Sequence, residues 1–226
     1  MKNLFEKFEI LATEDQLKKL EKYYELLVHY NKMFNLTAIT EREEVYLKHF
    51  VDSGIKVDKL VGNKLIDVGS GGGFPALVIK ILRPDIDVTM LEATGKKCEF
   101  LKTVISELGL ENCQVINARA EDLAKNLEYR EQFDLCTARA VARLNTLLEY
   151  CLPFVKVGGK FVAYKGNATE EILEAKNALN LLGGQISKLE EYTLLDAQRA
   201  LIYVDKIKST NAKYPRGNGK ERKSPL

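Results

Sequence analysis

The sequence predicts an α/β fold built on a mostly parallel sheet, and three observations lead to this prediction. A turn with four glycines, Gly69-Ser-Gly-Gly-Gly73, follows a short apolar strand over 64–68. From this strand onward, apolar runs of strand length alternate with runs of helical periodicity. The length of 226 residues suits one medium-sized domain with an appendage. A strand, a glycine turn and a helix in succession form a nucleotide-type binding unit, because glycines allow the backbone to approach a ligand closely.

The chain begins with a helical region. Thr13 and Gln16 match a T-x-x-Q capping box, and apolar residues then recur at helical spacing for about five turns. Thr40 and Glu43 form a second capping pattern, which predicts a helix that continues to about Ser53. The N-terminal part is therefore expected to be a helical subdomain that precedes the sheet.

Two polar residues of the second helix stand close together in the sequence. His49 lies three positions before Asp52, so a functional pair is one interpretation. The interpretation that we favour is a structural histidine, which packs the helical subdomain onto the sheet.

Strands and helices alternate after the glycine turn. The expected strands cover 64–68, 86–91, 114–117, 133–137 and 160–165. The expected helices cover 75–82, a segment that ends at Gly109, 122–126, 144–151 and 169–182. Two further extended stretches, 185–194 and 199–207, are expected to pair as an antiparallel hairpin, which gives a sheet of seven strands.

The charge of the chain is unevenly distributed. The overall net charge is +2, but residues 206–226 contain seven Lys or Arg and a single glutamate, a net +6, so the remainder carries about −4. A basic end on a mildly acidic body indicates either contact with a polyanion or a solvated, disordered terminus. We expect three regions: a helical subdomain over 1–60, a Rossmann-like domain over 61–207 and a basic flexible tail over 208–226.

Several classes of protein are disfavoured by composition. No apolar run reaches the length of a membrane span, and the first residues are too charged for a signal peptide. The four cysteines have no C-x-x-C spacing and there are only two histidines, so no metal site is expected. We expect reduced cysteines and a cytoplasmic protein. A monomer is compatible with the sequence.

The spacing of the glycines distinguishes between two cofactors. A dinucleotide fingerprint requires G-x-G-x-x-G, but Phe74 stands where its third glycine would be. The sequence instead reads G-x-G-x-G, through Gly69, Gly71 and Gly73. This variant is typical of S-adenosylmethionine-dependent methyltransferases, whose cofactor has no pyrophosphate to be held by the turn and the following helix. The sequence therefore favours S-adenosylmethionine, and an NAD-dependent oxidoreductase is the alternative.

Acidic residues stand at the expected distances from the turn. Glu92 lies 23 residues after Gly69, at the end of the second strand, where a carboxylate accepts hydrogen bonds from ribose hydroxyls. Asp67 directly precedes the turn and is in position to meet a cationic amino group. Ala120 and Glu121 follow the third strand and are expected to border the adenine. Each acid alone could be a solvated charge, but together they favour cofactor binding.

Seven sequence blocks carry a resemblance that covers nearly the whole chain. The chain resembles the 16S rRNA (guanine-N7) methyltransferase G family, also called glucose-inhibited division protein B. The blocks are Asn35-Leu-Thr-Ala-Ile-Thr40, His49-Phe-Val-Asp-Ser53, Ile66-Asp-Val-Gly-Ser-Gly-Gly-Gly-Phe-Pro75, Leu91-Glu-Ala-Thr-Gly-Lys-Lys97, Ala118-Arg-Ala-Glu121, Ala138-Arg-Ala-Val-Ala142 and Tyr164-Lys-Gly166.

The resemblance implies a class I methyltransferase fold and methylation of guanine N7 in small-subunit rRNA near the decoding region. The partner would be 16S rRNA or the small ribosomal subunit. The cofactor-contacting positions that it implies are Gly69, Phe74, Glu92, Ala93, Thr94, Ala120, Glu121 and Arg139. The basic ending departs from the family pattern at Gly217 and Glu221, where a basic residue and a proline are expected.

No catalytic acid or base is expected. Guanine N7 has an exposed lone pair and needs no deprotonation, so the enzyme has to align N7 with the activated methyl group. Lys165 is the remaining candidate for a contact with RNA or the target base, and a solvated lysine at a strand end is the alternative. Signatures of other methylation chemistries are missing: no cysteine follows Pro or Thr, and the fourth strand is followed by Thr137-Ala-Arg-Ala140 instead of an N6-adenine motif.

Contacts with RNA are expected from basic side chains. The candidates are the tail, Arg143, Lys96 and Lys97. The acidic body favours recognition of an assembled particle or of folded rRNA with protein partners. Two other functions remain open, a non-catalytic RNA-binding or ribosome-assembly factor with a retained cofactor pocket and a small-molecule methyltransferase.

Overall fold

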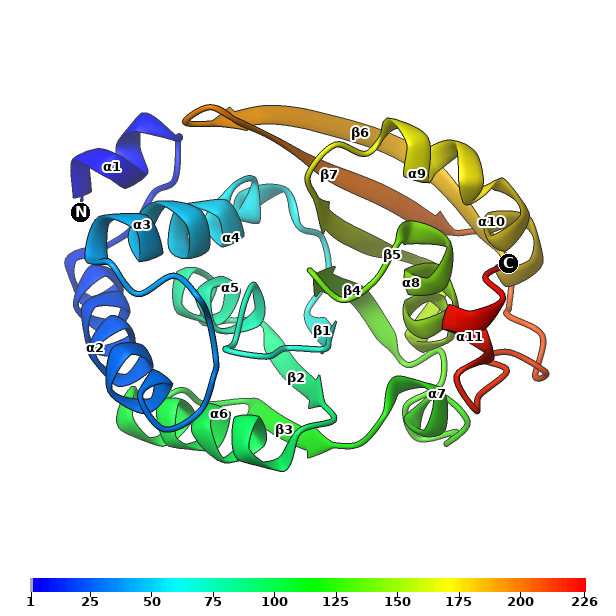
Figure 1. Ribbon diagram of the computed structural model, residues 1–226, viewed down its shortest axis with the longest axis horizontal. Helices are drawn as coiled ribbons and strands as arrows, with labels where there is room; N and C mark the ends of the chain where they lie inside the picture. Colours follow the sequence, from blue (N-terminus) through cyan, green and yellow to red (C-terminus); the bar gives the residue numbers. More distant parts are fainter. Residues whose placement is uncertain (1) are drawn as a thin grey trace.

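A seven-stranded sheet forms the centre of the molecule (Figure 1), and the computed structural model describes residues 2–226. The strand order is β3-β2-β1-β4-β5-β7-β6. The strands are β1 Lys64–Val68, β2 Asp87–Glu92, β3 Cys113–Asn117, β4 Phe133–Arg139, β5 Val155–Lys165, β6 Gly184–Leu194 and β7 Ala197–Lys206. The first five are parallel, and β7 runs antiparallel to both of its neighbours. The mostly parallel sheet and its final hairpin are therefore confirmed.

Both faces of the sheet are covered by helices, so adjacent strand residues enter different apolar cores. In β1, Leu65 belongs to the core that contains α2, α5 and α6, whereas Ile66 belongs to the core that contains α8 and α10. Figure 1 shows these two helical layers on either side of the sheet. The helices of the Rossmann-like part are α5 Ala76–Leu82, α6 Gly95–Glu107, α7 Ala120–Leu123, α8 Leu144–Cys151, α9 Thr169–Glu174 and α10 Lys176–Leu182.

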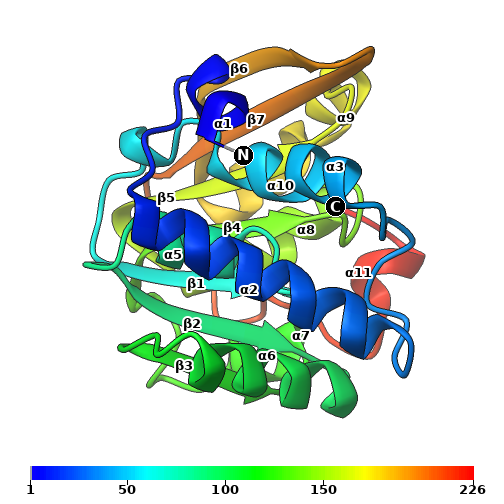
Figure 2. The same ribbon diagram turned by 90° about the vertical axis from the view of Figure 1, so that its left-hand side faces the viewer.

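The N-terminal helices add to one of these layers. They are α1 Lys2–Lys7, α2 Glu14–Asn31, α3 Arg42–Val45 and α4 Asp52–Gly54, with a π-helical turn over Tyr46–Val51 between the last two. The capping box of Thr13 and Gln16 is confirmed, with both reciprocal hydrogen bonds present. Figure 2 shows α2 lying across the sheet on the side that faces the viewer. The tyrosine Tyr23 of α2 is fully buried there and donates to the carbonyl oxygen of Gly72.

The second capping pattern is wrong. Glu41 is the N-cap of α3, in an extended conformation and with no side-chain cap hydrogen bond. Glu43 therefore occupies the second helical position instead of the third, where a capping-box side chain could reach back to the N-cap amide. The long helix expected over 169–182 is likewise divided, into α9 and α10.

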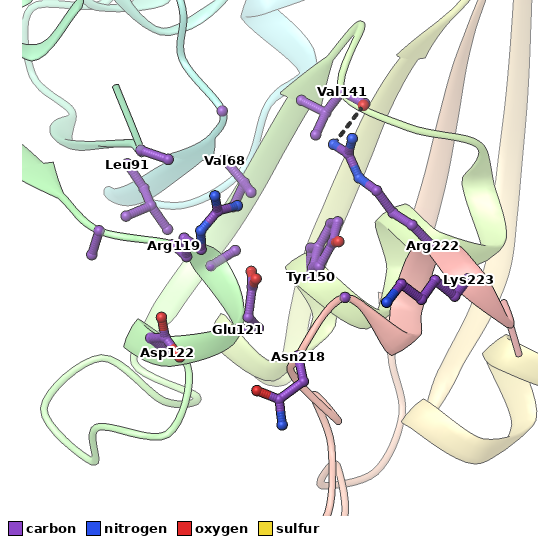
Figure 3. Close-up of a pocket in the computed structure, with 15 residues that line it drawn as sticks. Val68, Leu91, Arg119, Glu121, Asp122, Val141, Tyr150, Asn218, Arg222 and Lys223 are labelled. Atoms are coloured by element: carbon purple, nitrogen blue, oxygen red, sulfur yellow. Dashed lines mark hydrogen bonds between the residues drawn. The ribbon is translucent and has the colours of Figure 1, made fainter. Parts of the chain in front are cut away.

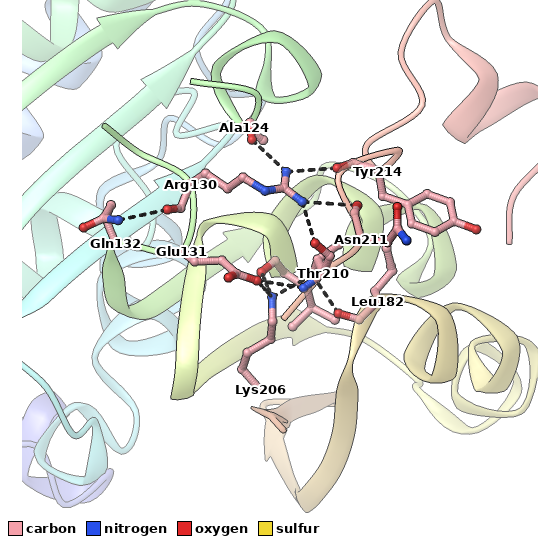
Figure 4. A network of polar contacts seen from close by, with 10 residues as sticks. Ala124, Arg130, Glu131, Gln132, Leu182, Lys206, Thr210, Asn211 and Tyr214 are labelled. Carbon is pink, nitrogen blue, oxygen red and sulfur yellow. Dashed lines mark hydrogen bonds and ion pairs between the residues drawn. The ribbon is translucent and has the colours of Figure 1, made fainter. Parts of the chain in front are cut away.

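The segment over 208–226, which we expected to be a flexible tail, packs against the body. Tyr214 is 5% exposed and Glu221 is fully buried. The short helix α11 Lys220–Lys223 packs on α8. Figure 4 shows Arg130 among the carbonyl groups of this segment, and its guanidinium donates to Thr210 O at 2.8 Å and to Tyr214 O at 3.0 Å. Composition predicted a solvated end because the counter-charges and donors that order it lie elsewhere in the chain.

Candidate active site

A cavity of about 580 Å³ opens at the carboxyl edge of the sheet, beside the glycine turn. The end of β1 contributes Val68 and Gly69, and the end of β2 contributes Leu91 and Ala93. Other walls come from 118–122, Val141, Tyr150 and the C-terminal segment. Figure 3 shows Glu121, Tyr150 and Arg222 around this space. Ligands of parallel α/β sheets bind at this edge, so the cavity lies where the fold predicts a site.

The glycine turn has the conformation that its composition predicts. Gly69, Gly71 and Gly73 have φ values of +74°, +55° and +96°. A Cβ at Gly69 would lie 2.7 Å from Cγ2 of Val141, so this position requires glycine for space as well as for conformation. The turn is fixed on the adjacent strand, because the amide of Gly69 donates to Leu91 O at 2.8 Å.

Glu92 closes the turn from the end of β2. Its carboxylate accepts hydrogen bonds from the amide of Gly71 at 2.9 Å and from the amide of Thr94 at 2.8 Å. The side chain does not line the cavity, whereas its neighbour Ala93 does. Glu92 therefore ties the glycine turn to the loop that follows β2, and this places both segments at the cavity.

Asp67 is completely buried beneath the turn. One carboxylate oxygen accepts from Oγ1 of Thr137 at 2.7 Å, and the other, Oδ2, has no hydrogen-bond partner within residues 2–226. Burial raises the pKa of Asp67 to about 6, although hydrogen bonds and the charge of Arg139 oppose the shift. An unpaired carboxylate oxygen next to a glycine turn is the feature that a cationic ligand group would satisfy.

Arg139, at the end of β4, is held by the N-terminal helices. Its guanidinium donates to Oδ2 of Asp52 at 2.8 Å and to Nδ1 of His49 at 2.9 Å. The imidazole of His49 stacks on the ring of Phe74 with centroids 4.4 Å apart, and the Arg139 guanidinium lies 5.1 Å from the same ring. None of these four side chains lines the cavity.

His49 is neutral in this cluster, and its Nδ1 lies 2.9 Å from Nη2 of Arg139 and 3.1 Å from the carbonyl oxygen of Lys48. Burial, reinforced by the charge of Arg139, lowers the pKa of His49 to about 3. Its Nε2 lies 2.8 Å from Oγ1 of Thr37, which fixes the other side of the ring. The histidine thus joins the helical subdomain to the sheet, as the structural interpretation predicted.

Asp52 contacts side chains from three strands of the sheet. Besides Arg139 it accepts from the hydroxyl of Tyr192 at 2.8 Å, and its Oδ1 lies 3.7 Å from Nε of Arg199. Because these residues come from α4, β4, β6 and β7, the cluster fixes the helical subdomain against the final hairpin.

Lys165 supports the loop between β4 and α8. Its ammonium donates to Ala142 O and pairs with Oε2 of Glu171, both at 2.6 Å. Glu171 also accepts from the amide of Leu144 at 2.6 Å. The side chain of Lys165 is therefore engaged in holding the segment that carries Val141 against the glycine turn.

The structure brings together part of the set expected from the sequence and adds other residues. Of the expected residues, Gly69, Ala93, Ala120 and Glu121 line the cavity. The expected residues that do not line it are Asp67, Gly71, Phe74, Glu92, Thr94, Arg139 and Lys165. The cavity residues that sequence reasoning missed are Val68, Leu91, Ala118, Arg119, Asp122, Val141, Tyr150, Asn218, Gly219, Arg222 and Lys223. Five of them stand within the sequence blocks that carry the family resemblance, namely Val68, Leu91, Ala118, Arg119 and Val141. Nothing local in the sequence indicates that the C-terminal segment returns to the glycine turn.

Two features are absent from the part of the chain that the structure describes. No group of three or more His, Cys, Asp or Glu side chains in residues 2–226 is arranged to hold a metal ion. Among the helices of the same residues, none is both long enough and apolar enough to span a bilayer.

Solved structures of low sequence similarity share the fold. TYW2 of P. horikoshii, in complex with MeSAdo, aligns with a TM-score of 0.55 and 15% identity over 68% of this chain and 61% of that chain. TYW2 of M. jannaschii, in complex with AdoMet, aligns with a TM-score of 0.53 and 15% identity over 66% of this chain and 71% of that chain. The fold is that of the class I methyltransferases.

Sequence comparison defines the family. The model of the GidB family, described as rRNA small subunit methyltransferase G, matches residues 16–202. Ribosomal RNA small subunit methyltransferase G of Lactobacillus johnsonii is 47% identical over 228 aligned positions, which cover 97% of this chain and 95% of that protein. The chain therefore belongs to the rRNA small subunit methyltransferase G family.

Proposed function

We propose that this protein transfers a methyl group from S-adenosylmethionine to N7 of a guanine in 16S rRNA, near the decoding region. The observation that carries the proposal is the family match over residues 16–202, which includes the glycine turn and all of the cavity lining except the C-terminal segment. The choice of guanine N7 rests on the family resemblance drawn from the sequence blocks. The substrate is 16S rRNA, free or within the small subunit, and the protein acts in the cytoplasm.

The residues around the turn fit S-adenosylmethionine. Gly69 and Ala93 have small side chains or none, so a ligand can approach their backbone closely, and Ala120 with Glu121 borders the space that we assign to the adenine. Glu92 and Asp67 do not line the cavity, but they lie directly behind the two segments that do, the loop after β2 and the glycine turn. Glu92 retains lone pairs on both carboxylate oxygens, which we assign to the ribose hydroxyls, and we assign the unpaired oxygen of Asp67 to the amino group of the cofactor. The two TYW2 structures that share the fold were crystallised in complex with AdoMet and with MeSAdo, which supports S-adenosylmethionine as the cofactor.

The protein's own residues position and shield the reacting groups. When bound, the cofactor would supply a methyl group activated by its sulfonium. Guanine N7 attacks with a lone pair and carries no proton, so no base is needed. His49 is not placed to act as a base, because it is buried outside the cavity, its Nδ1 faces the guanidinium of Arg139 and its pKa is lowered to about 3. Its ring packs on Phe74, which directly follows the glycine turn, and thereby supports the turn.

The test is incubation of the protein with labelled S-adenosylmethionine and either 16S rRNA or 30S particles from a strain that lacks the modification. Aniline cleavage then maps 7-methylguanine. We expect a single N7 product on at least one substrate. Gly69→Asp is the matched control, because a bulky charged side chain at this φ blocks the turn. The absence of an N7 product on both substrates would contradict the proposal.

The competing function, an assembly factor with a retained pocket, gives a different result in cells. If Gly69→Asp abolishes cofactor binding and yet supports full cellular function, the chain acts without methyl transfer. Loss of cellular function together with cofactor binding supports the enzyme.

A further inference from the structure

The C-terminal segment supplies one side of the cavity. Asn218, Gly219, Arg222 and Lys223 border it, opposite the loop that carries Glu121 (Figure 3). These residues are more than 75 positions beyond Val141 in the sequence, so their presence depends on how the segment is fastened.

Two arginines fasten the segment before it reaches the cavity. Arg130 binds the carbonyl oxygens of Thr210 and Tyr214 (Figure 4). Arg216 donates to both carboxylate oxygens of Glu149, at 2.9 Å from Nε and 2.7 Å from Nη2, and Glu149 is fully buried on α8. A bidentate pair of this kind fixes orientation as well as position.

Glu221 shapes the turn that borders the cavity. Its buried carboxylate accepts from the amide of Gly217, and its backbone carbonyl accepts from Oγ1 of Thr146 at 2.9 Å. These contacts close a loop around Asn218 and Gly219. The glutamate that departs from the family pattern is therefore a structural element of this turn.

Arg222 connects the segment to the glycine turn. Its guanidinium lies 3.4 Å from the carbonyl oxygen of Val141, and the dashed line in Figure 3 marks this contact. The side chain of Val141 is the group that a Cβ at Gly69 would meet. Val141 therefore links Arg222 of α11 to Gly69 of the glycine turn.

We propose that residues 217–223 form a wall of the cofactor pocket and that Arg222 is a positioning residue, which sets the place of Val141 against the turn. The inference rests on the proposed function to the extent that the cavity holds S-adenosylmethionine. It differs from a tail that only contacts RNA, because loss of such a tail leaves cofactor affinity unchanged.

Arg222→Ala and Lys220→Ala test the role of Arg222. Both remove one positive charge from α11, but Lys220 does not border the cavity. With S-adenosylhomocysteine as the probe in calorimetry, we expect Kd to rise about fivefold for Arg222→Ala, the size of one modest hydrogen bond, and to stay unchanged for Lys220→Ala. Arg222→Lys should recover part of the affinity, because it keeps a donor and the charge. Equal Kd values for Arg222→Ala and the unsubstituted protein would overturn the role of Arg222.

A chain that ends after Gly217 tests the wall as a whole. It keeps both arginine anchors, and circular dichroism verifies that it folds. We expect weaker S-adenosylhomocysteine binding than in Arg222→Ala, and in the full chain we expect the probe to slow hydrogen exchange of the 217–223 amides. If the shortened chain binds normally and the probe leaves these amides unaffected, the inference fails. If the full chain does not bind the probe at all, the proposed function itself fails.

Discussion

Gly69 combines a conformational and a steric requirement. Its φ of +74° disfavours any other residue, and a Cβ would approach Val141 Cγ2 to 2.7 Å. We expect Gly69→Ala to raise Kd for S-adenosylhomocysteine at least tenfold, because the turn has to shift where the cofactor binds. Gly109→Ala is the control: φ is +56° there, but no atom lies within 4 Å of the added Cβ.

The two alanine variants distinguish the effect of backbone strain on stability from the effect of the Val141 contact on ligand binding. The left-handed backbone should lower the free energy of unfolding by about 1 kcal/mol in both variants, and the contact with Val141 should add to this loss in Gly69→Ala. Only Gly69→Ala should affect binding. Similar binding by the two variants would show that the contact of Gly69 with Val141 does not shape the pocket.

Asp67 should make both stability and binding depend on pH. Its pKa is raised from 3.8 to about 6, so the folded protein binds a proton more readily than the unfolded chain. The stabilisation is fully present below pH 3.8 and is lost as pH rises through 6, up to about 3 kcal/mol. In urea titrations between pH 4 and 7, the difference in unfolding free energy between the unsubstituted protein and Asp67→Asn should follow this trend.

Cofactor binding should have the opposite pH dependence. A cationic amino group near Asp67 favours the ionised carboxylate, so binding releases a proton and tightens as pH rises through about 6. Calorimetry with S-adenosylhomocysteine should show this rise, and Asp67→Asn should lack it. An affinity that is independent of pH between 5 and 7 would separate Asp67 from the amino group.

At the scale of residues, the sequence proposes candidate site residues but does not give their contacts. Asp67 is expected from its position before the glycine turn, and Arg139 is implied by the family resemblance. Their partners could not be read locally, because Thr137 lies 70 positions from Asp67 and Asp52 lies 87 positions from Arg139. Arg139 has its contacts in the helical subdomain, where two carboxylate-binding arginines and a tyrosine share Asp52.

At the scale of elements, the C-terminal segment depends on one buried ion pair. Arg216 and Arg143 each lie 2.7 Å from a glutamate oxygen, but Glu149 is fully buried and Glu174 is exposed. Arg216→Ala leaves a buried carboxylate without its partner and should cost about 3 kcal/mol. Arg143→Ala should cause no measurable change in the free energy of unfolding, because water replaces the guanidinium at the exposed carboxylate of Glu174. Urea denaturation of both variants measures the difference, and equal losses would contradict the anchoring role of Arg216.

The ordered conformation of the same segment could not be predicted from hydrophobic periodicity. Periodicity located β1, α8 and the final hairpin almost to the residue, because each buries an apolar face against the sheet. Residues 208–226 bury mainly Tyr214 and a few polar groups, so no periodic pattern exists to be read. The order of this segment comes from Arg130, in the loop before β4, and from Thr146 and Glu149 of α8.

For the whole molecule, topology explains how the cavity is assembled. Parallel strands β1, β2, β3 and β4 end at one edge, so Gly69, Ala93, Ala120 and Val141 converge although they span 72 positions. This convergence was predictable from the alternation of strands and helices. The contribution of the C-terminal segment was not predictable, because this segment reaches the cavity by packing on α8 and does not follow a strand of the sheet.

The same arrangement predicts which charges bind RNA. Lys213 and Lys220 are exposed on the C-terminal segment and do not border the cavity, so they are free to contact phosphates. Replacing both by alanine should weaken RNA binding and reduce the slope of log affinity against log salt by roughly 1.4, about 0.7 for each single-stranded phosphate contact. Cofactor affinity should not change. Lys7→Ala with Lys18→Ala is the control, because these exposed lysines lie on α1 and α2, across the molecule from α11 in Figure 1. Filter binding to 16S rRNA at several salt concentrations measures the slopes. If the control pair lowers the slope as much as the C-terminal pair, RNA binding follows net charge and not this face of the protein.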